Sequence, residues 1–337
     1  MKSTVKNTGI FGGAKPRRPQ ALFLVLVVVG LLALAGVVSA DPYYMGEDLA
    51  TIQSGTGDIS YNANDCWVTT TDVIYHSNTT TFQVPATAIN NVSWARLYVT
   101  VYMGNMNTNY YGNETITFGA TPLATAQPLH LAYDRTSGAT HTSPGGYFTD
   151  LNRVTSDYIN TFDVTNLITS QNIQLTTETW NESDSELDPG VGKFDGRIKG
   201  AILVVAYNDG NAANDVNYWV NPGHDTVTKY WLNPAYISNT TFATGSVFTQ
   251  DDSTWTGTLY VPYLASADGS YEYSVDGGST LTNLASNSPG KLGTYLGRDS
   301  WTVNGAYLQD LTFYYNRSST QSYYKIPLAV LTAYQDS

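Results

Sequence analysis

The chain has few of the residues on which disulfide-stapled folds and metal sites are built. Its 337 residues include one cysteine, Cys66, and four histidines. One thiol cannot form an internal disulfide framework, and the histidines at 76, 130, 141 and 224 show no metal-ligand spacing. Stability must therefore come from a buried core. Cys66 is either a small buried apolar side chain or forms a disulfide bond with another chain.

Basic residues are also scarce once the start of the chain is set aside. Five of the 16 Lys and Arg residues precede residue 20, which leaves 11 against 28 Asp and Glu, a net charge of −17. Such a surface repels nucleic acid and anionic lipid, so neither is expected as a partner. The last apolar run, residues 326–334, is too short to span a bilayer, so no span is expected after the start of the chain.

The first 40 residues have the three parts of a secretory signal. A basic stretch without acids precedes the uncharged run "ALFLVLVVVGLLALAGVV", and the small residues "VSA" end at Ala40. This order predicts an N-terminal signal helix over 1–40, cleaved between Ala40 and Asp41, and hence a secreted or cell-surface protein. The apolar run is also about long enough to span a bilayer, so an uncleaved anchor is the alternative.

Helical periodicity is nearly absent after the signal. Short runs of β-branched and aromatic residues alternate with polar ones and are bounded by Gly, Pro, Asn and Asp; examples are "ARLYVTVYM" (95–103), "NIQLTTETW" (172–180) and "GTLYVPYL" (257–264). Strands at this spacing, with turn signals between them, are typical of a β-sandwich or jelly roll. The sequence therefore predicts an all-β fold.

The chain nearly repeats itself. "YHSNTTTF" (75–82) resembles "YISNTTF" (236–242), and Trp67-Val68 upstream matches Trp219-Val220. Three further pairs follow in the same order: 94–103 with 255–264, 114–125 with 271–284, and 196–207 with 323–334. Matches in one order predict a duplicated module, the first copy carrying an insertion between about 123 and 160.

The duplication sets the expected domain organisation. We predict two tandem, related, jelly-roll-like β-sandwich modules at 65–209 and 210–337, preceded by an extended arm at 41–64. Each copy closes on an unbroken apolar run, "AILVVAY" or "IPLAVLTAY", which predicts strands buried on both faces, central in a sheet or between the modules. Pro262 and Pro327 interrupt strand-like runs and predict edges or bulges.

Three segments carry a family resemblance: "FDVTNLI" (162–168), "KGAILVVAYND" (199–209) and "NYWVNPGHD" (217–225). Together they resemble a domain of unknown function common in secreted and surface proteins of methanogenic archaea. The family motif Tyr-Trp-x-Asn-x-Gly-x-Asp corresponds to Tyr218, Trp219, Asn221, Gly223 and Asp225, whereas Pro222 departs from the acid more usual there. The resemblance implies an archaeal cell-surface β-protein and brings no catalytic residues. A weaker similarity links the chain to jelly rolls of carbohydrate-binding type.

Acidic loops supply the candidate metal ligands. In "ESDSELDPGVGKFDG" (182–196), carboxylates alternate at Asp184, Glu186 and Asp188, with Asp195 nearby. Hard oxygen ligands alternating along a loop suit Ca²⁺, although the EF-hand spacing is not met. A second oxygen-rich loop is "NDGNAAND" (208–215). The alternative for both is a solvated acidic loop without metal, so Ca²⁺ is the one cofactor considered and none is certain.

Glycosylation sequons are frequent, which suits an exported chain. Asn113, Asn181 and Asn316 lie in turn-like, polar contexts and are the preferred acceptors. The remaining Asn-x-Ser/Thr sites are Asn78, Asn91 and Asn239. Asn78 and Asn239 occupy the same place in the two copies, which a shared turn would also explain.

Candidate catalytic residues form no recognisable arrangement. His224 and Asp225 are neighbours, but adjacent residues on a strand point to opposite faces, and there is no Gly-x-Ser-x-Gly elbow. Carboxylates such as Glu114 and Glu178 could supply a glycosidase pair, as in any acidic protein. No enzymatic activity is therefore expected.

Paired tyrosines remain, at 43–44, 110–111, 314–315 and 323–324. One of each pair should face outward and either decorate the sheet or form a contact surface. The hypothesis from sequence is a non-catalytic structural component of an archaeal surface layer, sheath or extracellular filament. It would self-assemble or bind other envelope proteins, by strand addition at sheet edges or through the arm. The alternative is a glycan-binding or adhesin module using exposed aromatics.

Overall fold

The computed structural model describes residues 48–66, 75–104, 110–131, 157–182, 194–213, 215–227, 237–245, 247–248, 254–264, 271–274, 279–280, 282–283, 296–309, 311–317 and 324–335. The expected signal and its cleavage point between Ala40 and Asp41 lie outside these residues. Within them the only helices are short 3-10 turns, η1 (Ala86–Ala88), η2 (Thr165–Leu167) and η4 (Gly305–Tyr307). None of them has the length or the apolar character to cross a membrane.

The described chain consists almost entirely of strands, as the sequence predicted. The first eight are β1 (Gln53–Asp65), β2 (Tyr75–Gln83), β3 (Val92–Tyr102), β4 (Tyr110–Phe118), β5 (Thr121–Leu131), β6 (Asp157–Asp163), β7 (Asn172–Asn181) and β8 (Arg197–Tyr207). The next eight are β9 (Val216–Val227), β10 (Ile237–Thr241), β11 (Trp255–Leu264), β12 (Tyr271–Ser274), β13 (Thr282–Asn283), β14 (Leu296–Asn304), β15 (Thr312–Arg317) and β16 (Tyr324–Gln335).

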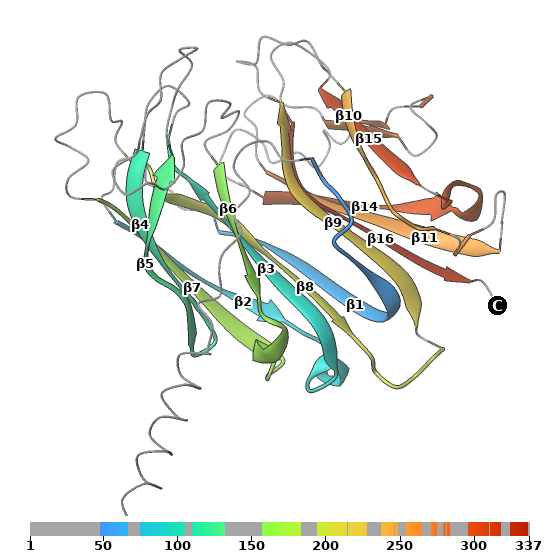
Figure 1. The fold of residues 1–337 in the computed structure, drawn as a ribbon, viewed down its shortest axis with the longest axis horizontal. Helices are drawn as coiled ribbons and strands as arrows, with labels where there is room; N and C mark the ends of the chain where they lie inside the picture. The colour runs from blue at the N-terminus through green and yellow to red at the C-terminus, as the bar shows by residue number, and fades with distance from the viewer. Residues whose placement is uncertain are drawn as a thin grey trace, which may run out of the picture. The chain divides into compact units, whose positions relative to one another are not determined.

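The sheet order confirms the duplication. One four-stranded sheet has the order β2-β7-β4-β5 and another the order β10-β15-β12-β13. The eight-stranded sheet consists of β6-β3-β8-β1 followed by β9-β16-β11-β14. Adding eight to every strand number of the first half therefore reproduces the second half. Each module is a sandwich of one four-stranded sheet and one half of the eight-stranded sheet (Figure 1).

A pair of matching asparagine contacts fixes the register between the two copies. Asn64 donates from Nδ2 to the Thr80 hydroxyl and the Thr81 carbonyl, both at 3.1 Å. Asn221 donates to the Thr240 hydroxyl at 2.9 Å and the Thr241 carbonyl at 3.1 Å. Strand β1 is therefore the counterpart of β9.

This register corrects two expectations. It places the counterpart of Trp219 at Asn62, so the match of Trp219 with Trp67 was wrong. Residues 53–64, expected to lie in an arm ahead of the first module, instead form most of β1 (Gln53–Asp65), which pairs with both β8 and β9. The weak apolar patterning of this segment had suggested that it lay outside the sandwich.

Strand β1 reverses direction within its own length. Residues 53–57 pair antiparallel with β9, Gly57 lying opposite Val216. Residues 58–65 pair antiparallel with β8, Asp58 lying opposite Tyr207. The bend is visible where the blue strand turns back in Figure 1. Because Gly57 has φ +142° and a Cβ there would lie 2.9 Å from the Tyr207 carbonyl oxygen, only glycine fits the bend.

The bend brings the two halves of the eight-stranded sheet face to face. Tyr61 of β1 and Tyr260 of β11 have ring centroids 4.3 Å apart, although three strand intervals, about 14 Å, separate β1 from β11 along the sheet. Arg298 of β14 donates to the Ala63 carbonyl of β1 at 2.5 Å. The facing surfaces bury one apolar cluster, the module interface, to which β8 contributes Ile202 and Val204, and β9 and β16 contribute Val220 and Val330.

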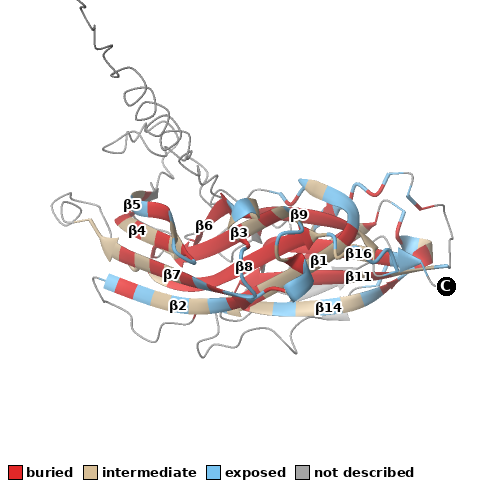
Figure 2. Cartoon of the chain, turned by 90° about the horizontal axis from the view of Figure 1, so that it is seen from below, coloured by how far each residue is buried: buried red, intermediate tan, exposed pale blue. Residues whose placement is uncertain are grey.

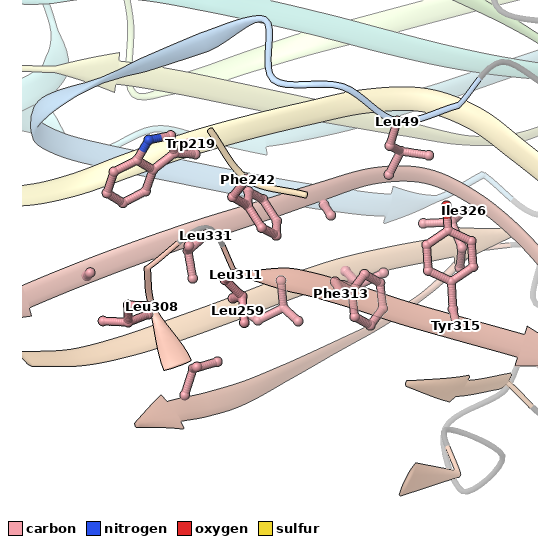
Figure 3. Close-up of a cluster of buried hydrophobic side chains, with 14 of the residues drawn as sticks. Leu49, Trp219, Phe242, Leu259, Leu308, Leu311, Phe313, Tyr315, Ile326 and Leu331 are labelled. Carbon is pink, nitrogen blue, oxygen red and sulfur yellow. The ribbon is translucent and has the colours of Figure 1, made fainter. Parts of the chain in front are cut away.

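Each sandwich also has an interior core of its own. In the second module, Trp219, Leu259 and Leu331 of the eight-stranded sheet pack near Phe313 and Tyr315 of β15, as Figure 3 shows. Leu49, which precedes β1, joins this core. In the first module, Val101, Met103 and Tyr158 pack with Tyr110, Leu129 and Phe194. Strands β3, β8 and β11 of the eight-stranded sheet are therefore mostly buried on both faces, as their red colour in Figure 2 indicates, whereas β14 is largely half-buried or exposed.

The predictions for the apolar runs and the prolines are confirmed. Strand β8 is buried along all of its inner positions and lies between β1 and β3, while β16 lies between β9 and β11. Pro327 occupies a register shift between Ile326 and Leu328. Pro262 lies beyond Tyr260, where the pairing of β11 with β16 ends.

Replacing Gly57 with alanine tests the bend in β1. Gly57→Ala should lower the free energy of unfolding by about 2–4 kcal/mol, because alanine meets a backbone oxygen and an unfavourable φ. Gly245→Ala is the matched control: Gly245 has φ +58° and open space around the position of a Cβ, so about 1 kcal/mol is expected. Thermal and urea unfolding measure both, and equal losses would contradict the role given to the bend.

Candidate functional site

A cluster of buried charges joins the two modules at one end of the module interface. Asp157 begins β6 and lies opposite Tyr102, the last residue of β3. Its carboxylate is 2.6 Å from Lys199 Nζ of β8 and also forms an ion pair with Lys325 of β16. We call Asp157, Lys199 and Lys325 the ion cluster. Two members come from the first module and one from the second, so the cluster exists only when the modules are packed together.

A bulge in β8 places Lys199 in the cluster. In the pairing of β8 with β3, Thr100 lies opposite Gly200 and Val101 opposite Ile198, so Lys199 is an extra residue in the ladder. Bulges of this kind redirect a side chain that would otherwise alternate with its neighbours. Ile198 thereby keeps its place opposite Val101, while Lys199 reaches Asp157.

Burial strengthens the electrostatic interactions among the three charged groups of the ion cluster. The Asp157 side chain is fully buried, and those of Lys199 and Lys325 are 8% and 9% exposed. Burial alone would raise the pKa of Asp157, but the two ammonium groups outweigh it and hold that pKa well below its usual range. Burial and the neighbouring Lys325 lower the pKa of Lys199 to about 8, against the attraction of Asp157.

Aromatic and charged side chains continue the cluster toward its more exposed side. The Tyr102 ring lies 4.6 Å from Lys199 Nζ and 5.1 Å from Arg197 Cζ, within cation–π distance. Arg197 forms a two-pronged ion pair with Asp195, at 2.5 Å from Nε and 2.8 Å from the terminal nitrogen. The carbonyl of Asp195 is 2.6 Å from Nε2 of His76, which is buried.

Both carboxylate oxygens of Asp195, one of the expected Ca²⁺ ligands, are therefore engaged by Arg197. The other expected ligands, Asp184, Glu186 and Asp188, lie outside the described residues. In the part of the chain that the structure covers, no three Asp, Glu, His or Cys side chains are arranged to hold a metal. Ca²⁺ binding by the acidic loop stays a prediction.

Glu114 is a second buried ionisable group, inside the first sandwich. Its carboxyl group is fully buried and accepts a hydrogen bond from Asn160 Nδ2 at 2.9 Å. Burial raises the pKa of Glu114 to about 8, and the bond from Asn160 only partly offsets this. The other oxygen of each side chain has no hydrogen-bond partner among the described residues. At neutral pH Glu114 is therefore largely a neutral acid.

The family motif on β9 has a structural role. Trp219 donates to the Ala243 carbonyl at 3.0 Å. Asn221 also accepts from the Thr51 hydroxyl at 2.6 Å, which ties the segment before β1 to the second module. Asp225 accepts from Ser238 and Tyr315 at 2.6 and 2.5 Å.

The motif side chains do not all lie on one face of β9. Trp219 belongs to the core of the second sandwich, whereas Tyr218 belongs to the module interface. Gly223 is buried with them. His224, also buried, adds to the lowering of the pKa of Asp157, while Asp225 bonds inside the sandwich. The expectation that His224 and Asp225 face opposite ways is confirmed.

The glycosylation candidates differ in accessibility. Asn91 and Asn239 are exposed, whereas Asn78, Asn113 and Asn181 are half-buried. Of the three preferred acceptors, Asn113 and Asn181 lie on paired strands rather than in turns, and the side chain of Asn316 lies outside the description. Exposure therefore favours Asn91 and Asn239 over the preferred set.

Cys66 and the paired tyrosines are more buried than an interaction surface requires. Cys66 is 2% exposed, and burial raises the pKa of its thiol to about 12, which fits a small buried apolar side chain. Tyr110 and Tyr111 are both buried, so the expectation that one of them faces outward was wrong. In the pair on β15, Tyr315 is buried and Tyr314 half-buried.

Sequence reasoning did not find the ion cluster. Its members are 42 and 126 residues apart along the chain, and no motif links them. One signal was present: a lysine stands just before the apolar run of each copy, in "KGAILVVAY" and "KIPLAVLTAY". A charge at the start of a strand buried on both faces needs a partner, and only the fold identifies that partner as Asp157.

Comparison with protein families gives one match, a family described as proteins of unknown function, over residues 42–334. The chain belongs to this family, DUF3344. Membership confirms that the resemblance was to a domain of unknown function. No curated protein matches the chain.

Solved structures provide remote likenesses. A peptide-N(4)-(N-acetyl-β-D-glucosaminyl)asparagine amidase is 11% identical, with a TM-score of 0.26 over 82% of this chain and 96% of that chain. PNGase F of Flavobacterium meningosepticum is 10% identical, with a TM-score of 0.24 over 83% and 96%. The ANXUR2 extracellular domain of Arabidopsis thaliana is 10% identical, with a TM-score of 0.21 over 86% and 90%. Likenesses this remote carry no argument about activity.

Removing the shared carboxylate should destabilise the protein more than removing one lysine. Asp157→Asn leaves two buried ammonium groups facing each other and should cost about 3–5 kcal/mol, whereas Lys325→Met leaves one ion pair and should cost about 1–2 kcal/mol. Because the folded pKa of Asp157 is depressed, its stabilisation is present above about pH 4 and is lost below it. Urea unfolding at pH 3 and pH 7 measures both effects; a larger loss for Lys325→Met would contradict this account.

Glu114 should make stability fall as the pH rises. Its folded pKa, about 8, exceeds the ordinary 4.5, so the folded state loses stability between about pH 5 and pH 8 as the buried carboxyl group ionises. Glu114→Gln keeps an acceptor for Asn160 and cannot ionise. The variant should gain on the order of 3 kcal/mol over the wild type across this range. Melting temperatures at pH 5 and pH 8 test this, with Glu178→Gln as a surface control; parallel pH profiles of wild type and Glu114→Gln would refute it.

Proposed function

We propose that the protein is an exported, non-catalytic structural component of an archaeal cell envelope, such as a surface layer, sheath or extracellular filament. The observation that carries the proposal is the module interface, in which a continuous apolar cluster and the ion cluster hold two sandwiches together. Two modules joined in this way would act as one unit, as a subunit under mechanical load needs. Because the facing sheet surfaces are already covered, further copies of the protein could pack against its remaining surfaces.

Several further features support this proposal. The first 40 residues have the composition of a secretory signal, and the resemblance to surface proteins of methanogens suggests the setting. Two buried carboxylates hold strands together: Asp157 joins β6 to β8 and β16, and Asp225 joins β9 to β10 and β15. A hydrolase would instead need a pair of carboxylates facing a common cleft.

Assembly would use the ends of the sheets. Among the described strands, β2, β5, β6, β10, β13 and β14 lie at sheet edges. Edge strands present unpaired backbone groups and can accept a strand from another copy. Ca²⁺ at the acidic loop of residues 182–196 would neutralise part of the negative charge that keeps copies apart. The alternative, glycan binding through exposed aromatic side chains, fits the same export.

Light scattering on the secreted protein tests the structural proposal. The protein should form a large assembly in millimolar Ca²⁺ and return to small species with chelator. Replacing Asp184, Glu186 and Asp188 with their amides should abolish the Ca²⁺ dependence. The matched control, Asp209→Asn with Asp215→Asn, changes the other acidic loop and should retain it. A monomer under both conditions would contradict Ca²⁺-driven self-assembly and favour a subunit that needs another partner.

A further inference from the structure

The outer face of the first module carries an aromatic row across three strands. Tyr75 at the start of β2 lies opposite Trp180 of β7, and Trp180 lies opposite Asn113 of β4. Tyr75 is 48% exposed, and Trp180 and Asn113 are half-buried. The residues next in sequence to Tyr75 and Asn113, His76 and Glu114, are buried in the sandwich. The row therefore faces away from the core, on the edge of the protein where β2 and β7 lie in Figure 2.

Two rows of polar side chains, five of them hydroxyl-bearing, lie beside the aromatic row. The next row along the strands is Ser77, Glu178 and Thr115, and the row after it is Thr79, Thr176 and Thr117. Neighbouring strands are about 4.8 Å apart, and side chains on the same face of one strand about 7 Å apart. The three rows thus form one patch, the sheet platform, with aromatic rings along one side and hydroxyl groups and one carboxylate across the rest.

Hydrogen bonds already hold several side chains of the platform in place. The Tyr75 hydroxyl donates a hydrogen bond to Glu178 Oε1, which fixes the ring near Trp180. The Thr79 and Thr176 hydroxyls are 3.3 Å apart and hold each other. A surface fixed before binding loses less conformational entropy when a ligand arrives.

We propose that the sheet platform binds a neutral polysaccharide. The faces of Tyr75 and Trp180 suit the C–H faces of sugar rings, since aromatic rings are electron-rich on their faces. The Ser77, Thr115 and Asn113 side chains can each donate to and accept from sugar hydroxyls. Glu178 contributes an acceptor and a negative charge, which favours a neutral chain over an anionic one.

The composition of the platform distinguishes a glycan from a protein partner. The centre of a protein interface is rich in apolar side chains, Met and Arg, and poor in Ser and Glu. The platform has two aromatic residues and otherwise hydroxyls, an amide and one carboxylate, with no aliphatic anchor among its nine positions. In the second module the equivalents of Thr79 and Thr176 are Asn239 and Tyr314, which are cross-strand partners, so the two faces differ in this row.

This inference deepens the proposed function and rests on the export of the protein, because the cell envelope would be the source of the polysaccharide. It assigns the first module to attachment and leaves assembly to the sheet edges. Protein secreted by a bacterial host without N-glycosylation excludes a glycan on Asn113 of the same chain as the occupant.

Affinity electrophoresis tests the platform. The secreted protein is run in native gels containing soluble β-glucan, galactomannan, dextran or alginate. At least one of the three neutral polysaccharides should retard it, and alginate should not. Trp180→Ala and Tyr75→Ala should each weaken the apparent affinity by about tenfold or more. Tyr75→Phe, which keeps the ring and loses the hydroxyl contacts to Glu178 and Ser77, should lose less.

Matched controls and unfolding curves make the result decisive. Tyr307→Ala and Tyr334→Ala remove tyrosines that are 49% and 45% exposed elsewhere and should leave retardation unchanged. Circular dichroism and melting temperature check that all variants are folded. No retardation by any neutral polysaccharide, retardation by alginate alone, or equal loss in platform and control variants would overturn the inference.

Light scattering on the same variants separates this inference from the structural proposal. If Tyr75→Ala and Trp180→Ala disrupt assembly and leave retardation unchanged, the platform is a protein interface and the inference fails. If they lose retardation and still assemble in Ca²⁺, both proposals stand. A monomeric protein that polysaccharide retards through Tyr75 and Trp180 would contradict Ca²⁺-driven assembly alone.

Discussion

The burial of one sheet face of each module against the other is the constraint on which the rest of the structure depends. The facing apolar strands can be covered only if β1 passes from one half of the eight-stranded sheet to the other, which requires the bend at Gly57. At one end of this interface the apolar cluster borders buried charged side chains, where Asp157 forms an ion pair with a lysine from each module. These ion pairs offset the desolvation cost of burying the three charges, and the pair with Lys325 forms only while the modules stay packed.

Duplication explains the architecture, and the differences between the copies suggest which residues serve binding rather than folding. Asn64 and Asn221 make the same two contacts in their respective modules, so the strand register is shared. Asn221 makes one contact more, to Thr51, through which the N-terminal segment completes the second module. The first module has the Tyr75–Trp180 row, and its Thr79–Thr176 pair corresponds to Asn239–Tyr314 in the second module. Shared residues thus hold the fold, and unshared ones are available for recognition.

The fold class could be predicted because strand periodicity and turn residues are local signals, and because a repeat is visible without a structure. The runs ending at Tyr207 and Tyr334 indicated central strands for the same reason. Strand β1 could not be recognised, because its residues alternate weakly and its partners, β8 and β9, lie more than 130 residues away. The turn-like setting expected for Asn113 and Asn181 was wrong, because both lie in paired strands, and their glycosylation stays a prediction.

The sequence by itself determined that the chain is β-structured, duplicated, acidic and equipped with a signal-like start, since these follow from composition and order along the chain. Only the tertiary structure decided that Asp157 meets Lys199 and Lys325, that Glu114 is a buried neutral acid, and that Tyr75 stands beside Trp180. These contacts join residues far apart along the chain, and burial sets the charge state of the ionisable groups. Both depend on which sheets face each other, a choice made by the packing of whole apolar surfaces rather than by any short stretch of residues.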